Sequence, residues 1–514
     1  MTSAEYVYTA IPRGEYIGLL ELSPGEPPDV ISVSLQVAPL RNCAPYTALS
    51  YVWGTSNTSM NIICNGAPLT IQKISNDLEW FGLVEYADPE GLSQLSAIER
   101  ELWENLSRVF SSPWFTRVWV IQEAGLATDA TVLCGTRTIP WQQLADVAGC
   151  IDDRASAFAE HFDMTEGLQR CVDLYWLFSP SGRRRSLVET LGEARCFNTT
   201  NMLDKVYALL SHPSAFTTSG ALLMDPDYGL SQDEMSARIA MSVLRECNSL
   251  QLLSAVHHND AQGVDTDPLP SFAPRWHEPP AANMLWAGIR GRTFKASLVH
   301  PARYRIFEPQ RSLVVTGIQF DIVSDIGPQM DRHMWRGEDP ERRGLVECLA
   351  GLLASHEDVT SVRYPPGQRR TEAFVMTMTC GMFMGEMADF EAYARRCGFR
   401  PAHSPASQPV LSESPRRQDV AGEEARFIDA GGIWSPYRKP FVTRQGHIGL
   451  GPKAVDQGDI VCVLFGCMVP FILRKGSGSR YRLVGECYVP GITKGEVIEA
   501  WETGELTEEE FTIH

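Results

Sequence analysis

Two short stretches of the sequence carry the residue types that could do chemistry. Residues 46–54 read YTALSYVWG, a β-favouring run that ends on Trp53 and Gly54 before a polar loop. Such a strand end is typical of a pocket wall, because an indole offers a flat apolar face and glycine lets a ligand approach the backbone. In the stretch WVIQE, Trp119 and Glu123 are four residues apart. On a helix this spacing places the carboxylate and the indole on one face, one turn apart.

A sheet and a helix are needed to position these residues. Residues 30–71 alternate or run apolar between turn signals, which predicts strands. A helical repeat over 98–110 stops at SSP. There Ser112 before Pro113 predicts a new helix, with serine as its cap and proline in its first turn. We expect this helix to run to about Gly125, and DATVLCGTRTIPWQQLADVA then predicts one strand, a turn and another helix.

The character of the chain changes several times after these stretches. Residues 150–260 read as mainly helical, residues 285–330 as β-like and residues 340–400 as helical again. Residues 399–425 are rich in Pro, Ser and charge, which is typical of a mobile loop or linker. Residues 440–492 predict a compact all-β unit.

Composition excludes several classes of function. The 514 residues carry a net charge of −18, which disfavours binding to nucleic acid or to an anionic membrane, since both need clustered Lys and Arg. The 13 cysteines include no CxxC pair, so neither a disulfide framework nor a zinc site is predicted, and no metal site is expected. Scattered, unpaired thiols favour a reducing compartment.

Neither an export signal nor a membrane-spanning segment is predicted. The N-terminal residues lack the apolar core of a signal peptide. The longest apolar run, Ile460 to Leu473, is interrupted by Gly466 and Pro470 and is too short to span a bilayer. It predicts two strands that meet at a turn. We therefore expect a cytoplasmic protein.

Six blocks of sequence, in order along the chain, resemble the fungal heterokaryon-incompatibility (HET) domain family. They are YTALSYVWG, SSPWFTRVWVIQEAGLA, SLVETL with DKVYALLS, LPSFAPRW, GHIGLGP, and GDIVCVLFGCMVPFILR with YRLVGECYVPG. The first two resemble the HET domain itself. The later blocks resemble a C-terminal region common to many large members, so the resemblance covers roughly residues 30–495.

The resemblance implies a role in fungal self/non-self recognition, in which the HET domain triggers cell death when incompatible strains fuse. The family also resembles TIR domains, some of which cleave NAD+, and WVIQE keeps the Trp-to-Glu spacing of their active helix. It implies Glu123 as the catalytic carboxylate, stabilising a ribosyl cation or holding the ribose hydroxyls. NAD+ would be a substrate, no cofactor would be required, and protein partners and self-assembly would be expected. The residues implied in nucleotide binding are Ser50, Tyr51, Trp53, Gly54, Arg117 and Trp119.

One departure from the family concerns the middle of the HET domain. Members carry a central block that reads like LWIDAICINQ, a helix and a strand like VVVWLG, and this chain lacks it. The lost block would supply core strands of a parallel sheet. The predicted fold is therefore α/β, an abbreviated TIR-like HET domain, followed by a mainly α region and a small β-rich C-terminal unit. The expected parts are an abbreviated HET domain at 30–150, a mainly helical region at 151–290, a mixed α+β region at 291–398, a mobile loop or linker at 399–425, and a β-rich unit at 426–495.

Other interpretations of the same residues stay open. Glu123 could be an ion-paired helix residue near Arg117 or Arg137, and Trp53 and Trp119 could be core or pocket-wall residues. Asp204 and Lys205 are expected to cap and bridge a helix, while His257, His258 and His447 are expected at the surface or in structural roles. At the level of the whole chain, the alternatives are a non-catalytic interaction protein and a family member recruited to fungal secondary metabolism.

Overall fold

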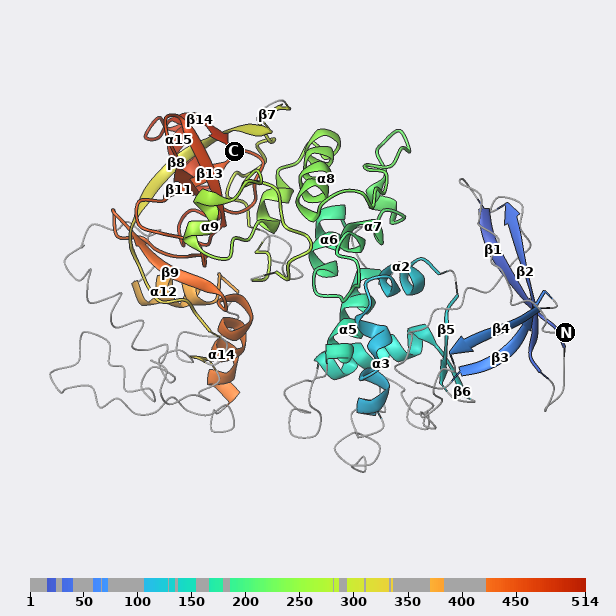
Figure 1. The fold of residues 1–514 in the computed structure, drawn as a ribbon. Helices are drawn as coiled ribbons and strands as arrows, with labels where there is room; N and C mark the ends of the chain where they lie inside the picture. Colours follow the sequence, from blue (N-terminus) through green and yellow to red (C-terminus); the bar gives the residue numbers. More distant parts are fainter. Residues whose placement is uncertain are drawn as a thin grey trace. The chain divides into compact units, whose positions relative to one another are not determined.

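The computed structural model of the chain divides into two compact units, residues 1–183 and residues 184–514 (Figure 1). The predicted strand at 46–54 and the junction where the central HET block is missing lie outside the described residues. So does the predicted linker at 399–425, apart from the first turn of the helix α14 Gly422–Trp434. The structure describes residues 16–24, 30–39, 59–65, 67–72, 106–127, 129–134, 137–153, 166–178, 185–280, 282–285, 294–308, 311–331, 334–335, 370–382 and 422–514.

The first unit contains a mixed four-stranded sheet in the order β1-β2-β3-β4. Its strands are β1 Tyr16–Leu22, β2 Ser32–Pro39, β3 Ser59–Cys64 and β4 Ala67–Gln72. β1 pairs antiparallel with β2, β2 pairs parallel with β3, and β3 pairs antiparallel with β4. The described strands confirm the β-rich start of the chain. The TIR-like form of this domain stays a prediction.

A helical layer with its own core forms the rest of the first unit. It consists of a helical turn ending at Phe110, the 3-10 helix η4 Pro113–Thr116, and the helices α2 Val120–Gly125, α3 Trp141–Asp153 and α5 Glu166–Phe178. Phe115 is buried and lies between Phe110 and Trp141, with ring centroids 5.6 and 6.4 Å away. Aromatic burial of this kind dominates core energetics, so these rings stabilise the position of η4 beside α3.

The predicted single helix from Pro113 to Gly125 is wrong in one respect. Ser112 does cap it, accepting a hydrogen bond from the Trp114 N–H, but only the short η4 follows. Arg117 then adopts an extended backbone (φ −77°, ψ 135°), and α2 begins afterwards. The aromatic and β-branched residues of this stretch are weak helix formers, so burying Phe115 outweighs helical continuity. The hairpin β5 Thr131–Cys134 and β6 Arg137–Pro140 likewise adds a strand where a turn was predicted.

The second unit begins with helices, as predicted for this part of the chain. Ser186 and Glu189 form a capping box at the start of the first of them: the Ser186 N–H donates to the Glu189 carboxylate at 2.7 Å, and the Glu189 N–H donates back to the serine hydroxyl. The helices are α6 Leu187–Ala194, α7 Asp204–Tyr207, α8 Gln232–Cys247 and α9 Ala261–Thr266, with the 3-10 helices η5 Pro213–Ala215 and η6 Gln251–Ala255 among them.

Asp204 and Lys205 do not cap α7 as expected. Leu203 is already helical and occupies the N-cap position, so Asp204 falls inside the first turn. There the Asp204 carboxylate accepts a hydrogen bond from the Tyr228 hydroxyl at 2.8 Å. Lys205 is buried, and its ammonium group donates to the backbone carbonyls of Arg195 and Phe197. The lysine therefore ties α7 to the end of α6 rather than to its own helix.

Five strands of the second unit close on themselves around an apolar interior. β8 pairs with β11, β11 with β12, β12 with β13, β13 with β14, and β14 returns to β8. Irregular registers in β11, β12 and β8 provide the bends that closure requires. The strands are β7 Tyr304–Phe307, β8 Ser312–Ile326, β9 Arg438–Thr443, β10 Ile448–Pro452, β11 Ile460–Leu464, β12 Phe471–Lys475, β13 Arg480–Glu486 and β14 Glu508–Ile513.

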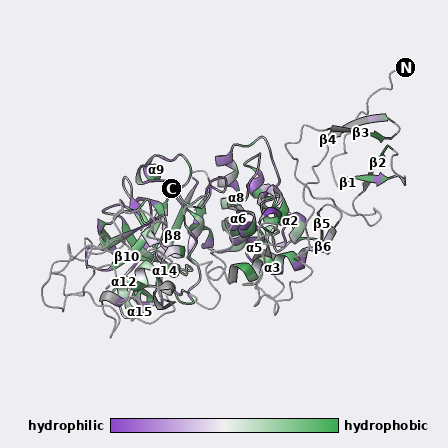
Figure 2. Cartoon of the chain, turned by 90° about the horizontal axis from the view of Figure 1, so that it is seen from below, coloured by the Kyte–Doolittle hydropathy of each residue, from purple (hydrophilic) through white to green (hydrophobic). Residues whose placement is uncertain are grey.

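The predicted pair of strands within 460–473 is confirmed as β11 and β12, which pair antiparallel. Figure 2 shows hydrophobic residues along β8 and β10, and every residue of β10 is buried. Gly449 in β10 lies under the ring of Phe441, where a Cβ atom would come within 2.2 Å of the ring. The remaining helices are α12 Arg370–Met378, α14 Gly422–Trp434 and α15 Glu496–Glu502. Within the described residues, no helix is long and apolar enough to cross a membrane.

Candidate functional site

Three of the seven predicted site residues lie in the described part of the first unit. Trp119 occupies the N-cap of α2, and the Glu123 N–H donates to the Trp119 carbonyl at 3.1 Å, so the two residues are one helical turn apart as predicted. Arg117 lies just before them, with a guanidinium nitrogen 3.9 Å from the Glu123 carboxylate. Ser50, Tyr51, Trp53 and Gly54 lie outside the described residues.

The geometry of Arg117 and Glu123 permits rearrangement. Both side chains are 29% exposed, and 3.9 Å is a long ion-pair distance. An ion pair of this kind contributes only about 0–1 kcal/mol to stability. A ligand that offered Arg117 a stronger anion could therefore separate the two groups. The arrangement also fits the alternative in which Glu123 is an ion-paired helix residue.

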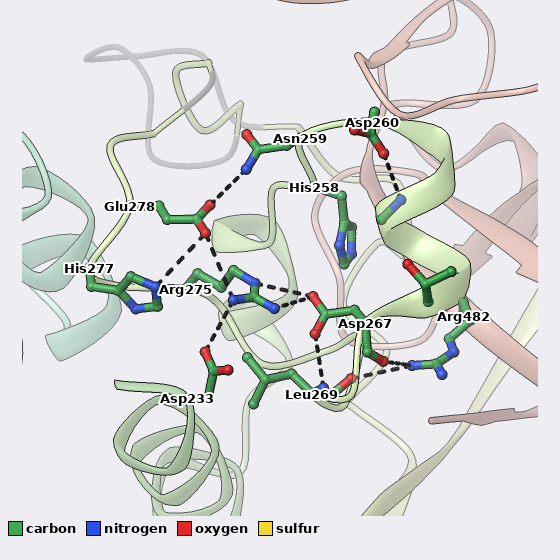
Figure 3. Close-up of polar contacts among 12 residues, drawn as sticks. Asp233, His258, Asn259, Asp260, Asp267, Leu269, Arg275, His277, Glu278 and Arg482 are labelled. Carbon is green, nitrogen blue, oxygen red and sulfur yellow. Dashed lines mark hydrogen bonds and ion pairs between the residues drawn. The ribbon is translucent and has the colours of Figure 1, made fainter. Parts of the chain in front are cut away.

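A second, denser polar cluster lies in the second unit around Arg275 (Figure 3). The Arg275 guanidinium donates to Asp267 at 2.5 and 3.1 Å and to Asp233 at 3.1 Å, and lies 3.8 Å from Glu278. Asp233 belongs to the first turn of α8, whereas Arg275 lies within the block LPSFAPRW. The arginine therefore joins that block to α8 through Asp233, while Asp267 and Glu278 surround the same guanidinium.

The side chains around Arg275 are in turn held by other residues. The Glu278 carboxylate accepts from Asn259 at 3.2 Å and lies 3.8 Å from His277 (Figure 3). Arg482 on β13 donates to the backbone carbonyls of Asp267 and Leu269 at 3.3 and 3.2 Å. The cluster thus connects α8, the LPSFAPRW block and the barrel within one unit.

Burial and charge shift the titration of this cluster. Burial would raise the pKa of Asp267, but hydrogen bonds from Arg275 and the Leu269 N–H outweigh it, so the pKa is lowered. The pKa of Arg275 is raised, because its carboxylate partners outweigh the burial that would lower it. The pKa of His277 is lowered, chiefly by burial. At neutral pH Asp267 is therefore ionised, Arg275 is charged and the His277 imidazole is neutral.

A comparison with known protein families finds a match in the barrel region. Residues 429–507 match the family described as the Het-6 beta-barrel domain. "Heterokaryon incompatibility protein 6, OR allele" of Neurospora crassa is 24% identical over 470 residues, which cover 77% of this chain and 66% of the relative. Both comparisons therefore show similarity to heterokaryon-incompatibility (HET) proteins. No solved structure matches it.

The match at 429–507 includes β9–β13 and α15, and so covers three strands of the closed barrel, β11, β12 and β13. Arg482 of the cluster lies within the matched residues, whereas Arg275 and its carboxylates precede them. The barrel therefore contacts, through Arg482, a segment that precedes the matched residues in the chain. Less than two thirds of the relative's length is covered.

Sequence reasoning missed the cluster around Arg275. His257, His258 and His447 are buried, which favours the structural alternative, and the His258 imidazole lies 2.8 Å from the Leu483 carbonyl. Nothing in the spacing of Asp233, Asp267 and Arg275 indicated that they meet. The one available signal was that Arg275 falls within a block that resembles the family. Within the described ranges, no group of His, Cys, Asp and Glu side chains could hold a metal ion.

Proposed function

We propose that this protein acts in fungal self/non-self recognition and signals cell death when incompatible strains fuse. The observation that carries the proposal is the match to heterokaryon incompatibility protein 6 across 77% of the chain. The relative's name records an OR allele, which describes a protein with allelic forms. Allelic forms are what a recognition protein needs to distinguish one strain from another.

For the chemistry, we propose that the first unit cleaves NAD+ with Glu123 as the catalytic residue. The bond between nicotinamide and ribose breaks, nicotinamide leaves with the electron pair, and a water molecule adds to the ribosyl cation while releasing a proton. Glu123 would stabilise that cation, since a nearby carboxylate favours positive charge on the sugar ring. Trp119 lies one helical turn from Glu123, which supports the proposal that its indole forms one wall of the nucleotide site.

Arg117 gives the proposed site a resting state. Without substrate it pairs with Glu123 at 3.9 Å. A nucleotide diphosphate offers the guanidinium a bidentate anion, which Arg binds more strongly than a single distant carboxylate. Phosphate binding would then release Glu123 toward the ribose. The proposal therefore assigns Arg117 to positioning and Glu123 to catalysis.

The test is nicotinamide release from NAD+ by the purified chain at high protein concentration. The parent is compared with Glu123→Gln, which keeps size and removes the charge. Glu166→Gln is the control, because Glu166 is an exposed glutamate at the start of α5 in the same unit. We expect release by the parent and the control, and a loss of at least about 100-fold in Glu123→Gln, the range of a lost catalytic group. Equal release by all three, or none by folded parent protein, would refute the chemistry.

A further inference from the structure

Three N–H donors are buried in the second unit without an acceptor. They are Nη2 of Arg195, Nε2 of His257 and the indole Nε1 of Trp276. The three residues are 3%, 9% and 0% exposed. Buried donors are almost always hydrogen-bonded, so three unpaired ones in one cluster require a physical explanation.

Arg195 connects the three residues. It lies at the C-cap of α6, and its guanidinium donates to the Glu278 carbonyl at 2.7 Å and to the Ala255 carbonyl at 2.9 Å. The same guanidinium lies 3.3 Å from His257 Nδ1 and 5.9 Å from the ring centre of Trp276. Because arginine can only donate, this contact favours the tautomer in which Nδ1 accepts and the imidazole proton lies on Nε2.

The charge of Arg195 is offset only in part, by the Glu278 carboxylate, which lies beyond ion-pair distance and opposes the effect of burial on the pKa of Arg195. Its contacts are two backbone carbonyls and an imidazole, and in the described part of the chain no acidic side chain lies within ion-pair distance of it. The carboxylate of Glu278 binds Asn259 and lies beside Arg275 instead. A buried charge without a partner costs several kcal/mol, so the folded protein gains if an anion supplies the missing charge.

Positive charges surround His257, whereas Cys196 and Glu278 add some negative potential at Arg195. Burial lowers the pKa of Arg195 to about 10, so it stays charged at neutral pH. The pKa of His257 lies well below its ordinary value, first because of burial and then because of the positive charges of Arg195 and Arg438. Arg438 is already paired with Glu486 at 3.0 Å. Of these two buried arginines, Arg195 is therefore the one without a carboxylate at ion-pair distance.

We propose that Arg195, His257 and Trp276 form a binding site for a small oxyanion, with phosphate or a carboxylate as the chemical class. The Nη2 group supplies charge, and the imidazole and indole N–H groups supply two neutral donors. The site offers donors only, which excludes a cation. A water molecule would accept two of the hydrogen bonds but would leave the charge of Arg195 uncompensated. The site is separate from Glu123, so it stands independently of NAD+ cleavage.

The experiment titrates sodium phosphate against the full chain at constant ionic strength and follows the unfolding midpoint of the second unit. We expect a saturable rise of about 2–4 °C at ten times the dissociation constant. The key variant is Trp276→Phe, which removes one donor and keeps a ring. We expect about tenfold weaker phosphate affinity, the effect of one lost hydrogen bond.

The matched control is Trp335→Phe. Trp335 is also buried in the second unit, but its indole N–H donates to the Ser435 hydroxyl at 2.7 Å. This variant should keep the parent's affinity for phosphate. Arg195→Gln should abolish the saturable response to phosphate if this variant folds. If it does not fold, the phosphate affinity of Trp276→Phe is the deciding measurement. A rise that is linear or equal in all variants, or no rise in the parent, would overturn the proposal.

Discussion

The two polar regions of this protein differ in how firmly their charges are held. In the first unit, Arg117 and Glu123 are separated by 3.9 Å and are both 29% exposed. In the second unit, Arg438 and Glu486 are 3.0 Å apart and only 2% exposed, and Arg275 is surrounded by three carboxylates. A loose, exposed pair can exchange partners when a substrate arrives. A dry, closely bonded pair cannot, so its role is to fix the structure.

The first unit therefore has an ion pair that can open, whereas the buried ion pairs of the second unit keep its structure fixed. The Glu123 region loses little when its ion pair opens, which suits a site that must bind and release a nucleotide. The barrel and its buried pairs hold a fixed surface, which suits discrimination between partners. If the effects expected from the following variants and pH changes are not observed, the contrast between the two units is weakened.

The largest expected effect comes from breaking the buried pair Arg438–Glu486. Glu486→Gln leaves a buried guanidinium without its charge partner, which should lower the free energy of unfolding of the second unit by about 3–5 kcal/mol. Urea unfolding monitored by tryptophan fluorescence measures the change. Glu508→Gln is the control, because Glu508 pairs with Arg303 at the surface and should cost at most about 1 kcal/mol. Equal losses in the two variants would refute the contrast.

A smaller effect is expected for Asp267, the principal partner of Arg275. Asp267→Asn should cost about 2 kcal/mol at pH 7, the value of charged hydrogen bonds to a half-buried group. The lowered pKa of Asp267 means that its contribution is present above pH 4 and is lost as pH falls through the folded value. The difference between parent and variant should therefore shrink in urea titrations at pH 3. A difference that stayed constant between pH 7 and pH 3 would contradict this account.

Acid should destabilise the second unit through its buried histidines. The pKa values of His257, His258 and His447 are lowered, in each case chiefly by burial. The unfolded chain therefore binds more protons, and stability that is complete above pH 6.5 is lost as pH falls below it. One such histidine gives a slope of about 1.4 kcal/mol per pH unit. Unfolding midpoints between pH 7.5 and 5 measure it, and a flat profile for the parent would contradict the neutral, buried state of these imidazoles.

The smallest effect on stability is expected for Glu123→Gln. The exposed pair with Arg117 contributes at most about 1 kcal/mol, so the first unit should unfold almost as the parent does. Circular dichroism during thermal unfolding measures this, with Glu166→Gln as the reference variant. A loss above about 2 kcal/mol would show that Glu123 stabilises the fold and is not free to rearrange.

Local patterns predicted the parts of the fold that depend on neighbouring residues. The serine cap at Ser112, the strands β11 and β12 and the spacing of Trp119 and Glu123 were all predicted from residues close in sequence. The break at Arg117 was not, because burial of Phe115 against α3 decides it. Barrel closure was not predicted either, since it joins β8 to β14 across nearly 200 residues.

Local sequence patterns also do not predict which residues meet in the polar clusters. Arg195, His257 and Trp276 come together only through the packing of the second unit, and no spacing in the sequence relates them. Two adjacent histidines without a ligand pattern predict surface or structural roles, and only the fold shows that both are buried. The ion pair between Arg117 and Glu123 was one of the predicted alternatives, because Arg117 lies shortly before the helix that contains Glu123.

The most direct test of the central proposal is a forced heterokaryon in Neurospora crassa. Hyphae expressing the parent chain, Glu123→Gln or Glu166→Gln are fused with strains of differing incompatibility type, and dead compartments are counted with a vital dye. We predict death with some partner strains and not others for the parent and for Glu166→Gln, and survival with every partner for Glu123→Gln. Equal survival for the parent and Glu123→Gln with every partner, at matched protein levels, would contradict the account.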